Sequence, residues 1–249
     1  MQVLIVHCHP EPSSFNAALT QIAVETLEGL GHQVEVADLY AEGFDPVEGP
    51  GHFETRRDDE RFAPLDEQRH AVESASLPAD VQREIARLER SDLVILQFPL
   101  WWHAQPAMLK GWFDRVFVYG GLYSGRMRYD RGRLRGKQVL CSVTTGSPAP
   151  AFSRDGRGGD IAALMWPIHC SLYYVGLEVL PPQLNYGIQG GGLSYQSETT
   201  FRDQLEADKA RWASRLKSLD DDTPIAFAGW DDWDEDGVLK HEHPARWRP

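Results

Sequence analysis

The chain has 249 residues, 42% of them hydrophobic, which suffices for one large domain with a sizeable core. Its formal net charge of −12 at pH 7 excludes the basic footprint that proteins bound to nucleic acid normally carry. No segment approaches the roughly 18–20 continuous apolar residues that cross a bilayer, so we expect no membrane insertion.

The three cysteines, Cys8, Cys141 and Cys170, lie far apart and form neither a CxxC pair nor a metal-ligand spacing. They predict free thiols and no metal site. The apolar run at residues 1–6 has no basic region before it, so it is typical of a strand and not of a signal peptide. A reducing, cytoplasmic setting is therefore expected.

Short apolar runs alternate with helical patterns along the chain. Strand–helix alternation at this spacing predicts a doubly wound α/β fold, in which a parallel five-stranded sheet has helices on both faces. We expect helices at 16–30, just before 92, after the loop 98–106 with Trp112 and Phe113, and at 201–216. We expect strands at 2–7, 33–38, 92–97, 138–144 and, interrupted by Pro181 and Pro182, within 177–186.

Two segments interrupt or extend this alternation. Residues 39–78 are polar, with several Gly and Pro, and are too long for an ordinary connection, so they predict an insertion in a domain that covers 1–218. Residues 219–249 form an acidic extension that contains Trp230, Trp233 and Trp247. Disordered tails rarely carry three tryptophans, so we expect it to pack on the domain or on a partner subunit.

Ligands of open parallel sheets bind outside the carboxyl ends of the strands, and three loops here follow such ends. The first loop, 9–16, contains Ser14 and Asn16, which can cap the next helix, and a helix N-terminus attracts anions. His9 could add a donor to a phosphate. The alternative is a plain capping loop, and the absence of GxGxxG and GxxxxGK[ST] disfavours a dinucleotide fingerprint and a P-loop.

The second loop, 98–106, carries Trp101 and Trp102 between prolines. Adjacent tryptophans suit a stiff wall beside a flat ring, although local core packing is an equal alternative. The third loop, 144–150, begins Thr-Thr-Gly-Ser, so backbone N–H groups can approach a ligand closely; the alternative is a generic turn. Together the three loops predict a slot for a flat, phosphorylated ligand.

Several motifs resemble the NAD(P)H:quinone oxidoreductase family, the flavodoxin-like group that includes DT-diaphorase, modulator-of-drug-activity and potassium-efflux ancillary proteins. The resemblance covers about residues 2–228 and is weakest at 189–205. It rests on His9 with Ser14-Phe15-Asn16, Asp38-Leu39-Tyr40 with Phe44-Asp45-Pro46, Phe98-Pro99-Leu100, the run 109–117, Thr144-Thr145-Gly146, Trp166-Pro167-Ile168, Pro182-Gln183-Leu184 and Asp222-Thr223-Pro224.

The resemblance implies a flavodoxin-like fold, a homodimer with its sites at the subunit interface, and FAD in preference to FMN. It implies two-electron reduction of quinones by NADH or NADPH through a double displacement. By resemblance, the flavin phosphates would contact His9, Ser14, Phe15 and Asn16. The flavin ring would contact Pro99, Leu100, Trp101, Trp102, His103, Thr144, Thr145, Gly146 and Ser147.

Substrate contacts are implied for Trp102, His103, Phe152 and, from the partner subunit, Tyr123. The family places a tyrosine and a histidine after the Thr-Thr-Gly loop for charge relay, but the matching positions here are Phe152 and Gly158. Trp101 and His103 replace a family glutamine and phenylalanine.

Neither Phe152 nor Gly158 can move a proton. We therefore expect fixed positive charge from Arg157, with backbone N–H groups near Gly146, to stabilise negative charge on the reduced ring. The alternative is that Arg157 points to solvent or pairs with Asp155 or Asp160.

Two other functions remain open. The altered pocket is also compatible with an azo, nitro or enone acceptor on the same fold. The chain could instead be a flavin-binding regulatory subunit of a transporter, for which the insertion 39–78 and the tail would supply an interface.

Overall fold

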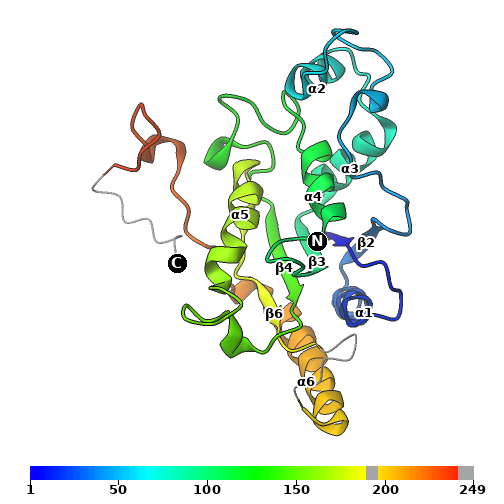
Figure 1. Cartoon of the computed structure of the whole chain (residues 1–249), viewed down its shortest axis with the longest axis vertical. Helices are drawn as coiled ribbons and strands as arrows, with labels where there is room; N and C mark the ends of the chain where they lie inside the picture. Colours follow the sequence, from blue (N-terminus) through cyan, green and yellow to red (C-terminus); the bar gives the residue numbers. More distant parts are fainter. Residues whose placement is uncertain (189–195, 241–249) are drawn as a thin grey trace.

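The computed structural model describes residues 1–188 and 196–240, which form a parallel sheet between two helix layers (Figure 1). The sheet order is β2-β1-β3-β4-β5, and all pairings are parallel. This is the flavodoxin-like order, as predicted. The strands are β1 Gln2–His7, β2 Gln33–Asp38, β3 Leu93–Pro99, β4 Gln138–Thr144, β5 Glu178–Val179 and β6 Gln183–Asn185.

The fifth strand position is divided, as the two prolines predict. β5 pairs with the start of β4 and β6 with its end, and Pro181 and Pro182 lie between them. Proline has no N–H to donate to a sheet ladder, so pairing stops where the prolines stand.

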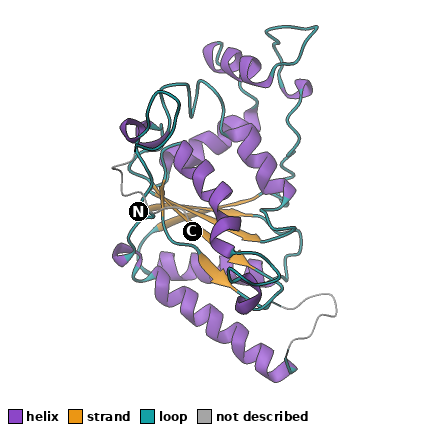
Figure 2. Ribbon diagram, turned by 60° about the vertical axis from the view of Figure 1, so that its left-hand side comes forward, coloured by secondary structure: helices purple, strands orange, loops and turns teal. Residues whose placement is uncertain are grey.

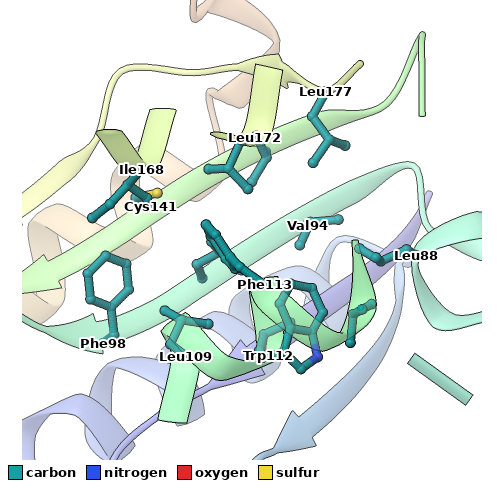
Figure 3. Close-up of a cluster of buried hydrophobic side chains, with 14 of the residues drawn as sticks. Leu88, Val94, Phe98, Leu109, Trp112, Phe113, Cys141, Ile168, Leu172 and Leu177 are labelled. Atoms are coloured by element: carbon teal, nitrogen blue, oxygen red, sulfur yellow. The ribbon is translucent and has the colours of Figure 1, made fainter. Parts of the chain in front are cut away.

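Helices cover both faces of the sheet (Figure 2). α1 Phe15–Gly29 and α6 Glu198–Leu216 bury Leu19, Leu27 and Trp212 against one face. α3 Ala79–Arg90, α4 Ala107–Val116 and α5 Ile161–Tyr174 pack on the other face (Figure 3). The strand residues alternate between these two cores, because successive side chains point to opposite faces.

The segment 39–78 is folded onto the domain and contains α2 Pro64–Glu73, which the sequence analysis did not predict. Arg115, 1% exposed, donates to the carbonyl of Asp45 at 2.7 Å and to Asp80 at 2.6 Å. A Cβ on Gly111 would lie 2.1 Å from the carbonyl oxygen of Pro46, so the close approach of this segment to α4 requires glycine.

The acidic extension packs on its own domain, which is one of the two predicted outcomes. Tyr173 donates to the carbonyl of Ala228 at 2.9 Å, and the rings of Tyr129 and Trp233 have centroids 4.6 Å apart. Trp247 lies outside the described residues. Among the described helices, none combines the length and apolarity needed to cross a membrane.

Candidate active site

The three predicted loops meet at one edge of the sheet. β1, β3 and β4 are adjacent and parallel, so their carboxyl ends lie together. The ring centroids of His9 and Trp101 are 5.8 Å apart, which joins the first loop to the second. Asn16 donates from Nδ2 to Thr144 Oγ1 at 3.0 Å, which joins the first loop to the third. The structure thus brings the loop residues together.

A buried polar cluster supports this edge from below. Asn16 is 4% exposed, and its Oδ1 accepts from Gln97 Nε2 at 2.9 Å. Its side chain is therefore occupied by Gln97 and Thr144, and the group of Asn16 that can face a ligand is its backbone amide. Sequence reasoning missed Gln97, although a glutamine inside the apolar run of β3 was a visible signal.

The N-terminus of α1 offers donors to an anion. Ser14 is the N-cap, and its hydroxyl accepts from the Ala17 amide at 3.1 Å. The amides of Phe15 and Asn16 belong to the first turn, which has no intrahelical acceptor for them, and the helix dipole adds partial positive charge. Glu11 shapes the loop in front of this turn by accepting from the Ser13 hydroxyl at 2.6 Å and amide at 2.9 Å, and these bonds lower the pKa of Glu11.

The second loop is a tight turn in which both tryptophans are exposed to solvent. Trp101 and Ala104 exchange backbone hydrogen bonds of 3.0 Å, while Trp102 and His103 have φ of 50° and 62°. Two consecutive positive φ values define a type I′ turn, a conformation that non-glycine residues adopt at a cost. Trp102 is 95% exposed and Trp101 is 41% exposed, so core packing is the wrong explanation for this pair.

The third loop turns its hydroxyl inward and its glycine outward. Thr145 is 2% exposed and donates to the carbonyl of Ser147 at 2.9 Å. A Cβ on Gly146 would meet nothing closer than the carbonyl of Ile188 at 4.0 Å, so the space over this glycine is open. Within the described chain, the amides of Gly146 and Ser147 have no acceptor. They are therefore free to face a ligand.

The loop after β4 folds tightly around the two positions that lack the family's relay residues. The Gly158 amide donates to the carbonyl of Ala151 at 2.7 Å. A Cβ on Gly158 would lie 2.9 Å from that oxygen and 3.1 Å from the Phe152 ring, so this loop has no room for a histidine there. Phe152 and Gly158 are thus in contact.

Arg157 is exposed, and among the described residues it makes no ion pair with Asp155 or Asp160. Asp160 instead caps α5 by accepting from the Ala162 amide at 2.9 Å. The solvent-facing alternative for Arg157 therefore agrees with the structure, and the ion-paired alternative does not.

Tyr123 lies apart from the other predicted site residues. α4 runs from the carboxyl end of β3 back toward the amino end of β4, and Tyr123 follows it. Its ring contacts Tyr119 and Tyr174, with both centroid distances 5.4 Å, and it lines a groove of about 640 Å³ between α2, α4 and α5. Within one chain, Tyr123 and the three loops occupy opposite edges of the sheet.

These features define a doubly wound α/β protein whose ligand-binding loops lie at the carboxyl edge of its sheet. The chain belongs to the flavodoxin-like fold family, whose model matches residues 1–216. It is 37% identical over 233 residues to ribosyldihydronicotinamide dehydrogenase [quinone] of Mus musculus, covering 90% of this chain and 94% of that one. It is 38% identical over 229 residues to NAD(P)H dehydrogenase [quinone] 1 of Cavia porcellus, covering 91% and 80%. The resemblance to the quinone oxidoreductase family is confirmed.

Comparison with solved structures supports the same family. An NAD(P)H:quinone oxidoreductase from Methanothermobacter marburgensis matches with a TM-score of 0.66 and 27% identity, over 88% of this chain and 97% of that one. A crystal structure from Klebsiella pneumoniae matches with a TM-score of 0.85 and 34% identity, over 96% and 94%.

Proposed function

We propose that this chain is a flavin-dependent NAD(P)H:quinone oxidoreductase. The observation that carries the proposal is the convergence, at one sheet edge, of free amides at the start of α1, free amides at Gly146 and Ser147, and the exposed Trp102. Two relatives, at 37% and 38% identity, are quinone dehydrogenases, which supports the same activity.

The residues fit a flavin. Amides of a helix N-terminus suit phosphate, an exposed indole suits a flat ring, and the open space over Gly146 admits a ring against the backbone. We assign the phosphates to His9, Ser14 and the amides of Phe15 and Asn16. When bound, the flavin would accept hydride from NADH or NADPH and deliver two electrons to a quinone.

The chain's own residues would orient the bound flavin ring and stabilise negative charge on it. The indoles of Trp101 and Trp102 would form one wall and exclude water from it. The amides of Gly146 and Ser147 would donate to negative charge that develops on the bound ring. His103 and Phe152 would then border the substrate, and their difference from the usual family residues would change the range of acceptors.

We propose FAD as the flavin. A hollow of about 530 Å³ lies between the loop after β4 and α6 and is lined by Pro148, Tyr186, Gly187, Gln204 and Arg211. This hollow adjoins the third loop through Pro148 and offers room for an adenosine half. Heat release of the cofactor followed by chromatography tests this: FAD is expected, and recovery of FMN alone would reject it.

The activity is tested by anaerobic turnover of quinone, azo and nitro acceptors with NADH and with NADPH. We expect quinones to be reduced fastest and the Trp102→Ala variant to lose roughly twofold to tenfold in kcat/KM, since an aromatic contact is worth about 0.5–1.5 kcal/mol beyond its buried area. Faster reduction of azo or nitro compounds would assign the alternative acceptor. Absence of turnover with every acceptor would reject the enzyme. The insertion 39–78 and residues 219–240 of the tail pack on this chain, so within the described residues no observation favours the regulatory-subunit alternative.

We also propose a homodimer. The groove at Phe113, Phe117, Tyr123, Trp166 and Tyr174 is apolar and has Lys110 and Asp114 at its rim. A second copy seated there would cover it, and Tyr123 of each chain could then reach the loop edge of the other.

A further inference from the structure

The loop 118–123, which follows α4, folds on itself and presents two tyrosine rings. The Gly120 amide donates to the carbonyl of Tyr123 at 2.7 Å, and the Leu122 amide donates to a carbonyl at the start of the loop at 3.0 Å. The rings of Tyr119 and Tyr123 meet edge to face, with centroids 5.4 Å apart. Because the loop is closed in this way, the place of Tyr123 depends on what holds Tyr119.

The insertion 39–78 holds Tyr119 through one buried side chain of α2. Gln68 is 4% exposed, and its Oε1 accepts from the Tyr119 amide at 3.0 Å. Its Nε2 donates to Glu48 Oε1 at 3.0 Å and to the carbonyl of Asp114 at 3.3 Å. A glutamine side chain has one acceptor oxygen and one NH₂ donor group, and Gln68 uses both. It therefore ties the tyrosine loop to the insertion and to α4.

The next residue of α2, Arg69, covers the same loop from the solvent side. Its guanidinium lies 4.5 Å from the centroid of the Tyr119 ring. A cation over an exposed ring holds it weakly, whereas loss of a buried hydrogen-bond partner leaves a backbone amide unpaired. Gln68 is therefore the residue of α2 whose removal should release the loop most.

The Tyr123 ring is held from two sides in the groove of about 640 Å³, which Gln68 also lines. On the α5 side it contacts the ring of Tyr174, with centroids 5.4 Å apart, and the Tyr174 hydroxyl accepts from Arg128 at 2.9 Å. On the other side it contacts Tyr119. The core of the domain thus fixes one side of the ring, and the insertion fixes the other.

We propose that Gln68 is a positioning residue of the quinone site: it holds the loop 118–123 so that Tyr123 covers the acceptor at the partner subunit's loop edge. This inference rests on the proposed activity and on the proposed dimer. Gln68 acts through Tyr123 and not on the acceptor itself. Its loss should therefore raise KM for the quinone more than it lowers kcat, because the missing contact is one of binding.

The first test follows the hold itself and requires no turnover. In the full-length chain labelled with 15N-tyrosine, hydrogen exchange of the Tyr119 amide reports its bond to Gln68, and a Tyr119→Phe variant assigns the resonance. Gln68→Met keeps the length of the side chain and removes both polar groups, so it should speed this exchange by about tenfold. Unchanged exchange in Gln68→Met would overturn the proposal.

Glu67→Gln is the matched control. Glu67 is the neighbouring buried polar residue of α2, 1% exposed, but it accepts from the Arg57 amide at 2.8 Å and does not hold the tyrosine loop. This variant should keep the native exchange of the Tyr119 amide and the native KM. Faster exchange in Glu67→Gln, equal to that of Gln68→Met, would mean that any disturbance of α2 frees the loop and would overturn the specific role of Gln68.

The second test is a double-mutant cycle in quinone turnover, at a protein concentration where light scattering gives every variant the native mass. Gln68→Met and Tyr123→Ala should each raise KM roughly threefold to tenfold, with kcat changed by less than about twofold. The double variant should match Tyr123→Ala, because residues that act as one unit do not add. Additive effects, or a native KM in Gln68→Met, would overturn the proposal. A native chain without turnover would reject the proposed activity, and this inference with it, even where amide exchange confirms the hold.

Discussion

At the residue scale, Arg157 is the group expected to replace the family's proton relay. It stands in a tight loop beside Gly158 and is exposed. Arginine side chains in general supply fixed positive charge. If its guanidinium reaches the bound ring, Arg157→Ala should slow reduction of the flavin by NAD(P)H by roughly tenfold to a hundredfold, the equivalent of one charge-assisted hydrogen bond. Stopped-flow absorbance measures this half-reaction.

Arg154 provides the matched control, since it is an exposed arginine three residues away in the same loop. Arg154→Ala should leave the rate unchanged, and Arg157→Lys should restore part of it. If Arg157→Ala reduces its flavin at the native rate, the amides of Gly146 and Ser147 are sufficient to stabilise the negative charge on the reduced ring.

His169 makes a pH-dependent contribution to stability. Its pKa is about 4 in the folded chain, because burial penalises the charged form, and about 6.5 when exposed. Between these values the unfolded chain binds a proton that the folded chain does not, so the unfolding free energy falls as pH falls from 6.5 to 4. The slope from this group is about 1.4 kcal/mol per pH unit.

Urea unfolding of the native chain and of His169→Leu at several pH values between 4 and 7 isolates the effect. Burial is the cause of the lowered pKa of His169, so the other ionisations, which both variants share, cancel in the difference. The native curve should be steeper across this window, and parallel curves would contradict the buried, neutral imidazole.

At the scale of the elements, the turn at 101–104 combines strain with exposure. Glycine takes positive φ without strain, so His103→Gly should relieve about 1–2 kcal/mol of strain and lose about 0.4–1 kcal/mol through a freer unfolded chain. A net gain of roughly 0–1.6 kcal/mol in unfolding free energy is expected, together with lower turnover. Urea unfolding and quinone assays measure the two effects, and a destabilised variant would show that the turn is not strained.

The sequence predicted most of these elements from periodicity. β4 was predicted with its observed ends, because Lys137 and the Thr-Thr-Gly loop bound a short apolar run. α2 was missed because few apolar residues mark its buried face, which instead carries Glu67 and Gln68. Gln68 is held by Glu48 at 3.0 Å and by the Tyr119 amide at 3.0 Å, and such long-range polar contacts leave no period in the sequence.

The sequence predicted which loops form the site, but it did not predict the backbone conformation of those loops. The strand ends and the Trp pair indicated where ligands bind. The positive φ of Trp102 could not be foreseen, because I′ turns are ordinarily recognised by Asn and Gly.

For the whole molecule, the apolar groove of about 640 Å³ and the exposed Trp102 predict association. Light scattering should give about twice the chain mass of 28.1 kDa. Phe117→Glu, which places a charge in the groove, should yield monomers and lower quinone turnover, whereas Leu65→Glu at its exposed rim should do so less. A native monomer with full turnover would contradict the shared site.

The central claim is that the carboxyl edge of this sheet holds a flavin. The most direct measurement is the absorbance spectrum of the purified chain, followed by titration of the cofactor-stripped chain with FAD and FMN by flavin fluorescence. We predict a yellow protein, one flavin per chain and saturable rebinding. A colourless chain that binds neither flavin would contradict it.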